Sequence, residues 1–255
     1  MGDPIIETGL AFFLIGIPAV MLAGISKGGF GSGASFVAAP LMALVLPPEM
    51  ALGVLMPLLL LVDGLTLKPY WQRWDMRQSR LLLIGAGPGV ILGIVFWKIA
   101  NQDMLRLLIG LIAIGYVVMQ LALRWRRPRA TRLAPPWLGM VTGAVSAFTS
   151  FVSHAGGPVA AVYLLSQDLS KTSYQATTVL VFGVVNVAKT VAYSALGAIT
   201  LQSLLAGLWL VPAAVVGAWL GVVAHRAVPE RAFFLITYAL LLAAGSKLIF
   251  DVVSS

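Results

Sequence analysis

Long apolar runs follow one another along the whole chain, separated by short polar or glycine-rich corners. Eight runs read as full membrane spans of about 20 residues, and the second and seventh are shorter. None alternates with the period of two that marks a membrane β-strand. The pattern predicts ten helical segments at Ile5–Gly24, Phe30–Leu46, Glu49–Leu67, Leu81–Trp97, Met104–Leu123, Trp137–Val152, Pro158–Ser166, Tyr174–Leu196, Ser203–Val223 and Arg231–Val253.

The composition agrees with this pattern and excludes a soluble protein. Hydrophobic residues make up 60% of the 255 residues and charged residues 10%, against roughly 25% charged in soluble domains. The mean hydropathy is +0.96, which leaves no room for a soluble catalytic domain. The absence of cysteine excludes disulfides and thiolate metal sites. We therefore expect an all-α polytopic membrane protein with about 8–10 transmembrane or half-membrane helices.

Each short segment is introduced by a glycine-rich break, one at Lys27–Gly33 and the other at His154–Pro158. Gly89–Gly93 and Gly217–Gly221 also share one layout, so the chain reads as an internal duplication. Corresponding helix interruptions in two halves are typical of transporters built from repeats. The two repeats expected within one integral membrane domain are Met1–Arg132 and Leu133–Ser255.

Basic residues crowd three corners, which the positive-inside rule places in the cytoplasm. These residues are Lys68, Arg73, Arg77 and Arg80, then Arg124, Arg126, Arg127, Arg129 and Arg132, then Arg226 and Arg231. If all ten segments cross the membrane, the N-terminus lies outside and the second repeat is inverted; if the short segments re-enter, the repeats are parallel. We favour inversion, because the N-terminal stretch is acidic. The net charge of +8 is then a consequence of topology and does not indicate nucleic-acid binding.

Both breaks are candidate anion sites. Non-helical backbone at membrane depth survives only inside protein or beside water, and a helix N-terminus after such a break presents free N–H groups to an anion. Alternatively, the glycines only allow close packing, as we expect for the row Gly85, Gly89 and Gly93. The predicted substrate-binding residues are Lys27, Gly28, Gly29, Gly31, Ser32, Ser153, His154, Gly156, Gly157, Asn186 and Lys189.

Ionisable residues inside apolar helices indicate a functional or structural role, because inserting a lysine at the centre of a membrane helix costs about 2.5–3.5 kcal/mol. We interpret Lys27 and Lys189 as cations that hold an anionic substrate. The alternatives are that Lys27 snorkels to the surface and that Lys189 pairs with Asp63. Asp63 and His154 are the candidates for proton coupling, although Asp63 could be interfacial and His154 a hydrogen-bonding spacer.

The sequence lacks a Gly-x-x-x-x-Gly-Lys-Ser/Thr phosphate loop, a His-Glu-x-x-His motif and a paired carboxylate cluster within a span. These absences argue against ATP-driven pumping and metal-dependent hydrolysis. We therefore expect no catalytic residue, no metal and no cofactor.

Three stretches resemble the TauE/SafE sulfite-exporter family over nearly the whole chain. They are Gly24–Gly33 leading to Pro40, Phe148–Pro158, and Asn186–Lys189. Ser32 departs from the family pattern, which often has glycine there. The resemblance implies a multi-pass carrier of the bacterial inner membrane that moves sulfur-containing anions such as sulfite or organosulfonates, often outward and coupled to protons.

The leading hypothesis is a secondary transporter of a small oxyanion, in contact with membrane lipid and working by alternating access between its repeats. One alternative is a membrane-embedded enzyme that uses His154 with nearby serines, although no acidic residue follows or precedes it closely. A second alternative is a scaffold protein that transports nothing. The sequence leaves the particular sulfur anion, the direction of transport, the coupling ion and the oligomeric state open.

Overall fold

The computed structural model describes residues 9–30, 35–125, 133–224 and 230–254. All regular elements in these residues are helical, which confirms the expected all-α class. The α-helices are α1 (Leu10–Ile25), α2 (Ala38–Met42), α3 (Pro48–Leu67), α4 (Met76–Ile99), α5 (Gln102–Trp125), α6 (Pro136–Ser153), α7 (Gly156–Leu164), α8 (Lys171–Ala195), α9 (Leu201–Ala224) and α10 (Glu230–Val253). Short turns are the π-helical η1 (Ser26–Phe30) and the 3-10 turns η2 (Ser35–Val37) and η3 (Lys68–Tyr70).

Seven helices in the described part of the chain are long and apolar enough to cross a membrane, which makes the protein a multi-pass membrane protein. The two predicted short segments are indeed short, with five residues in α2 and nine in α7. The helix α6 was expected to be a full span but is not among the seven. Its 18 residues include several serines and threonines, which lower its mean hydropathy.

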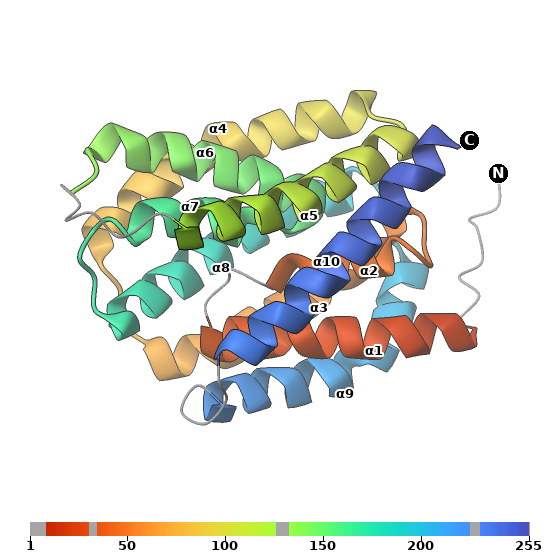
Figure 1. Cartoon of the computed structure of the whole chain (residues 1–255), viewed down its shortest axis with the longest axis horizontal. Coiled ribbons are helices and arrows are strands. Elements are labelled where there is room, and N and C mark those ends of the chain that lie inside the picture. The colour runs from red at the N-terminus through yellow and green to blue at the C-terminus, as the bar shows by residue number, and fades with distance from the viewer. Residues whose placement is uncertain (1–8, 31–34, 126–132, 225–229, 255) are drawn as a thin grey trace.

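The helices of the two halves interlock in pairs. In Figure 1, α4 lies beside α6 along the upper edge, α1 lies beside α9 along the lower edge, and α5 and α10 cross in front. The long helix α3 packs against both α8 and α9. Each of these pairs joins one helix from each predicted repeat. The inverted relation of the repeats stays a prediction, and their boundary at Arg132 lies outside the described residues.

Small residues bring the paired backbones into direct contact. A Cβ atom added to Gly85 of α4 would overlap the carbonyl oxygen of Met140 on α6. On α9, a Cβ atom at Gly217 would lie 2.6 Å from the carbonyl oxygen of Met21 on α1. Close backbone approach of this kind is how membrane helices associate without a hydrophobic driving force. The packing interpretation of the α4 glycine row is therefore confirmed.

Gly85→Leu is expected to prevent folding, because the new side chain has no space between α4 and α6. Overpacking a tight site costs about 1–3 kcal/mol and occasionally more. Gly87 offers a matched control on the same helix, since a Cβ atom there meets nothing within 4 Å. Gel filtration in detergent should show a monodisperse Gly87→Leu protein and an aggregated or absent Gly85→Leu protein. Equal behaviour of the two variants would contradict the tight crossing.

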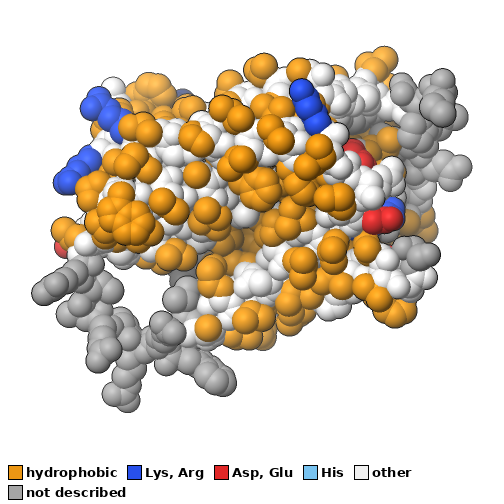
Figure 2. Space-filling model, turned by 90° about the horizontal axis from the view of Figure 1, so that it is seen from above, with side chains coloured by type: hydrophobic (Ala, Val, Ile, Leu, Met, Phe, Trp, Pro, Cys, Tyr) orange, Lys and Arg blue, Asp and Glu red, His pale blue; other side chains and the backbone are white. Residues whose placement is uncertain are grey.

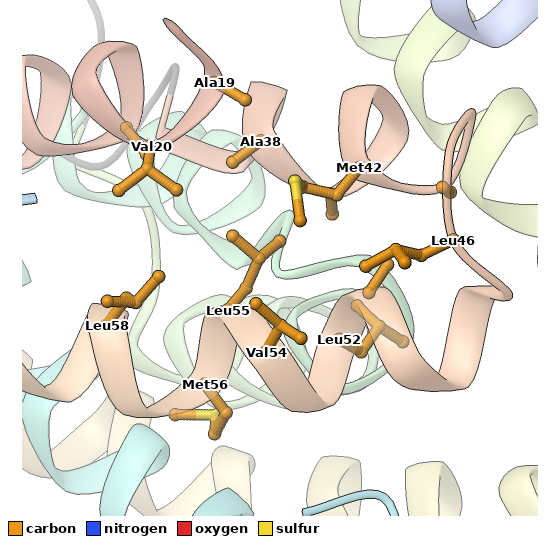
Figure 3. Close-up of a cluster of buried hydrophobic side chains, with 14 of the residues drawn as sticks. Ala19, Val20, Ala38, Met42, Leu46, Leu52, Val54, Leu55, Met56 and Leu58 are labelled. Atoms are coloured by element: carbon orange, nitrogen blue, oxygen red, sulfur yellow. The ribbon is translucent and has the colours of Figure 1, made fainter. Parts of the chain in front are cut away.

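The helix α3 lies at the centre of the largest buried apolar cluster. Figure 3 shows Leu52 and Leu55 of α3 facing Met42 of α2, with Val20 of α1 close by. The side chains of Leu52, Leu55 and Met42 are almost completely buried. A helix that is apolar on all sides belongs in the interior, so the single buried carboxylate of α3, Asp63, stands in an apolar setting.

The outer surface is apolar as well. Figure 2 shows hydrophobic side chains spread over the face in view, with Lys and Arg side chains near its margins. Large exposed side chains include Leu208, Trp209 and Trp219 of α9 and Ile91 of α4. A surface of this extent and composition is typical of a protein surrounded by lipid.

Candidate functional site

The first glycine-rich break is a π-helical turn at the end of α1. The turn η1 contains Lys27 and Gly28, and other helices complete its hydrogen bonds. The Gln175 side-chain amide donates to the Lys27 carbonyl at 2.9 Å, and the Tyr70 hydroxyl donates to the Gly28 carbonyl at 3.2 Å. Single π turns within α-helices occur frequently at functional sites.

The second break is a sharp reversal between α6 and α7. His154 follows the last residue of α6 in a left-handed conformation with φ of 55°, and its N–H donates to the Ser150 carbonyl at 2.9 Å. Helices commonly end in this way. The helix α7 begins at Gly156, two residues before the predicted start at Pro158. Pro158 still lies in the first turn, where a missing N–H breaks no intrahelical hydrogen bond.

An ion pair connects the first break to α3. The Nζ atom of Lys27 lies 2.5 Å from Oδ1 of Asp63, and Nδ2 of Asn186 on α8 donates to Oδ2 of Asp63 at 2.6 Å. Lys27 is 7% exposed and Asp63 is 5% exposed. Lys27 therefore does not snorkel to the surface, and Asp63 is buried inside the protein, whereas its depth in the membrane stays a prediction.

Lys189 of α8 is completely buried and has three acceptors around its ammonium group. They are Nδ1 of His154 at 2.8 Å, Oγ of Ser150 at 3.1 Å and Oδ1 of Asn186 at 3.4 Å. An ammonium group has three donors, so these contacts match a charged lysine. When Lys189 donates to Nδ1, the ring proton of a neutral His154 lies on Nε2, which faces the Leu52 carbonyl at 3.3 Å. Lys189 thus contacts Asn186, and the alternative pairing with Asp63 is not observed.

We call this set of side chains the buried charge cluster. Its members are Lys27, Asp63, Ser150, His154, Asn186 and Lys189. Among the described residues, the buried lysines and carboxylates are Lys27, Lys189 and Asp63 alone. With His154 neutral, two ammonium groups face one carboxylate. When Lys189 is protonated, the buried charge cluster carries an excess of one positive charge, which is costly to bury without a counter-ion.

A small cavity lies between the two breaks and touches the buried charge cluster. It has a volume of about 10 Å³, which is about the size that holds one water molecule. An oxyanion with four heavy atoms needs more space, so the site is closed in this conformation. Lining residues of this inner cavity are Lys27, Ser35, Leu59, Ser150, His154, Gly157, Phe182 and Asn186.

The family model described as Sulfite exporter TauE/SafE matches residues 16–248, which include both breaks and the whole buried charge cluster. The chain belongs to the TauE/SafE family. Membership makes it a membrane transporter, as the sequence predicted, and not an enzyme. No curated protein sequence and no solved structure shows a significant match to the chain.

In this TauE/SafE protein, the glycines of the first break face a neighbouring helix. A Cβ atom at Gly28 would lie 2.6 Å from a backbone oxygen of α9, and one at Gly29 would overlap another. Packing against α9 thus explains both glycines without a substrate. Gly31 and Ser32 of the predicted set lie outside the described residues.

The residues of the second break divide into two groups. Gly157 lines the inner cavity, whereas a Cβ atom at Gly156 would lie 2.6 Å from the Phe182 ring. The Ser153 hydroxyl donates to the Thr149 carbonyl of its own helix at 3.0 Å. Gly157 is therefore the glycine of this break that is best placed to meet a ligand.

Ser150 is a member of the buried charge cluster that the predicted set does not contain. Ser146, Ser150 and Ser153 follow one another at helical spacing, so they share one face of α6. The Ser146 hydroxyl donates to the Gly156 carbonyl at 2.6 Å, and Ser150 contacts Lys189. This periodicity is the signal that points to Ser150. No comparable signal marks Gln175, which holds the first break from α8.

An apolar groove of about 390 Å³ runs between α3 and α8 and reaches Asp63. Its lining residues are Leu60, Asp63, Gly64, Leu67, Val179, Leu180, Gly183, Val184 and Val187. Asp63 also lines a cavity of about 10 Å³ together with Lys27 and Gln175. The carboxylate therefore lies between the apolar groove and the buried charge cluster.

Proposed function

We propose that this TauE/SafE protein is a secondary transporter that exports small sulfur-containing anions, such as sulfite or organosulfonates, and binds them at the buried charge cluster. The observation that carries the proposal is that two lysines, Lys27 and Lys189, are buried with a single carboxylate, Asp63. A monoanion placed between the lysines would complete the charge balance. In the buried site the attraction between the anion and the lysines is stronger than at a protein surface, and it offsets the hydration that the anion loses on entry.

The substrate is proposed to lie in an expanded inner cavity, where it contacts Lys27, Gly157, Asn186 and Lys189. Gly157 is the second residue of α7, so its backbone N–H has no acceptor within that helix. The N-terminal end of α7 adds about half a positive charge. Gly28 and Gly29 support the site indirectly, since they hold the Lys27 turn against α9.

The buried charge cluster combines residues of both repeats, which supports alternating access. Asp63 and its hydrogen-bond partner Asn186 are 123 positions apart. Lys27 of η1 and Ser150 of α6, one from each proposed repeat, also both enter the cluster. A rocking motion of one repeat against the other would open this shared site to either side of the membrane.

Proton coupling is proposed to involve Asp63 and His154. Asp63 loses its ion-pair partner when Lys27 turns to a substrate, and a carboxylate left alone in an apolar setting takes up a proton. Nδ1 of His154 lies 2.8 Å from Nζ of Lys189, so a proton bound at Nδ1 would repel the Lys189 ammonium group toward the anion. Both changes link proton binding to anion binding.

Flux measurements in proteoliposomes test the proposed function. Vesicles loaded with sulfite, thiosulfate, sulfoacetate or an aryl sulfonate should release at least one of them without ATP, chemically unchanged and faster under a pH gradient. Protein-free vesicles give the background. Absence of flux for every anion would contradict transport of this substrate class, and chemical conversion of the solute would favour the enzyme alternative.

Gly157→Val is expected to abolish anion binding while the protein folds, because the branched side chain would fill the inner cavity. Gly115 provides a control, since a Cβ atom on this exposed glycine meets nothing within 4 Å. The measurement is the rise in melting temperature on addition of sulfite. We expect this rise for wild type and Gly115→Val but not for Gly157→Val. A normal rise in a folded Gly157→Val protein would place the anion elsewhere.

A further inference from the structure

Resting on the proposed function, we infer that Asp63 is a built-in competitor of the transported anion. Its carboxylate occupies Lys27 in the empty transporter, and the substrate must displace it before transport. Asp63 would then regulate the site, which anion binding by the lysines alone would not require. Net transport and one-for-one anion exchange should depend differently on Asp63.

The geometry places Lys27 between two alternative partners. Its ammonium group contacts Asp63 at 2.5 Å, and the same side chain lines the inner cavity beside Gly157 and His154. The second carboxylate oxygen of Asp63 is held by Asn186, which also lines the inner cavity. Both groups that hold Asp63 are therefore proposed substrate ligands. A cavity of about 10 Å³ leaves no room for an anion beside an intact Lys27–Asp63 pair.

The charges around Asp63 set the balance. Lys27 from η1 contacts Asp63 directly, whereas Lys189 from α8 and His154 from the α6–α7 corner are connected to it through Asn186. With Asp63 ionised, the two lysines accommodate one monoanion. With a dianion, the charges of the two lysines, Asp63 and the substrate sum to zero only when Asp63 is protonated. Transport of a dianion would therefore carry one proton with it.

Without substrate, the internal carboxylate also allows the empty transporter to close. Closing the site around two ammonium groups with no anion would bury both charges, which is strongly unfavourable. Asp63 removes one of them. Loss of Asp63 should thus trap the empty transporter while leaving the anion-loaded form able to change conformation.

Asp63→Asn in proteoliposomes separates these two movements. We expect net sulfite efflux to fall at least about tenfold more than sulfite–sulfite exchange does. Sulfite affinity should rise about tenfold, because a competing state lowers apparent affinity in proportion to its population. Asp251→Asn is the control, since Asp251 forms a lysine pair with Lys247 at the end of α10 outside the buried charge cluster. Equal loss of exchange and net efflux, or full retention of both, would overturn the inference.

The proposed function itself fails in a distinguishable way. If wild-type protein shows neither exchange nor net efflux of sulfite, the site does not carry this anion and the inference falls with the proposed function. If wild type shows both activities, only their separation in Asp63→Asn decides whether Asp63 competes with the substrate.

A second measurement uses the wild-type protein, in case Asp63→Asn does not fold. An apolar carbodiimide, which reacts with protonated carboxyl groups, can approach Asp63 through the apolar groove between α3 and α8. Sulfite added at a pH where it is a dianion should increase modification of Asp63, measured by mass spectrometry, because displacement from Lys27 favours the protonated acid. Unchanged or reduced modification in the presence of bound sulfite would overturn the inference.

Discussion

Lys189→Met is expected to abolish anion transport while the protein remains folded. Methionine has a similar length and suits an apolar interior, so it replaces the buried side chain without leaving a large cavity. The remaining lysine, Lys27, is already neutralised by Asp63. An incoming anion would then add an uncompensated buried charge. A penalty of about 3 kcal/mol corresponds to a loss of about 100-fold in affinity.

Sulfite flux in proteoliposomes and sulfite-induced thermal stabilisation measure this loss. Lys247→Met is the matched control, because Lys247 pairs with Asp251 on the exposed surface of α10. We expect normal transport for the control and at least about a 100-fold lower flux for Lys189→Met. Transport at the wild-type rate by Lys189→Met would show that Lys189 only fills the interior and that the helix N-terminus suffices for the anion.

Lys27→Met is expected to have the largest effect on stability. The substitution leaves the Asp63 carboxylate buried in α3 with Asn186 as its remaining partner. Breaking a buried ion pair by removing one partner costs about 3–5 kcal/mol, because the other charge stays uncompensated. Replacing both partners is much less harmful. The double variant Lys27→Met with Asp63→Asn should therefore recover most of the lost stability, although not transport.

Thermal unfolding in detergent, followed by gel filtration, measures this difference. The single variant should unfold at a clearly lower temperature than wild type, and the double variant should lie close to wild type. Lys98→Met, in the last turn of α4, controls for loss of a lysine as such. A double variant no more stable than Lys27→Met would argue against the ion pair as the source of the destabilisation.

The fold class was predictable because lipid imposes strong rules on sequence. Within a membrane, an apolar run of this length can hydrogen-bond all its backbone N–H and C=O groups within the segment only by forming an α-helix. The same cost of burial marked Lys27, Asp63, His154 and Lys189 as residues that need a reason, and the structure brings these four together in one cluster. The candidate site could therefore be predicted from the free-energy cost of burying ionisable side chains, without a catalytic or binding motif.

The pairing within the candidate site was not predictable in the same way. The sequence offered Lys189 as the partner of Asp63, whereas the structure gives that place to Lys27. The choice depends on how α1, α3 and α8 approach one another, and this is a matter of tertiary packing. Local signals were also silent on Gly28 and Gly156, where only the neighbouring backbone or ring shows that a side chain has no room.

Because helices of the first half pack against helices of the second half, the order of synthesis affects assembly. The helix α1 and the Lys27 turn pack on α9, near the other end of the chain. A ribosome therefore releases α1 into the membrane long before its partner exists, and Gly24 and Gly28 face lipid until α9 arrives. A nascent chain that stops before α9 lacks the helix against which Gly28 and the Lys27 turn pack. Because the buried charge cluster also needs Asn186 and Lys189 of α8, we expect it to assemble only after most of the chain has been inserted.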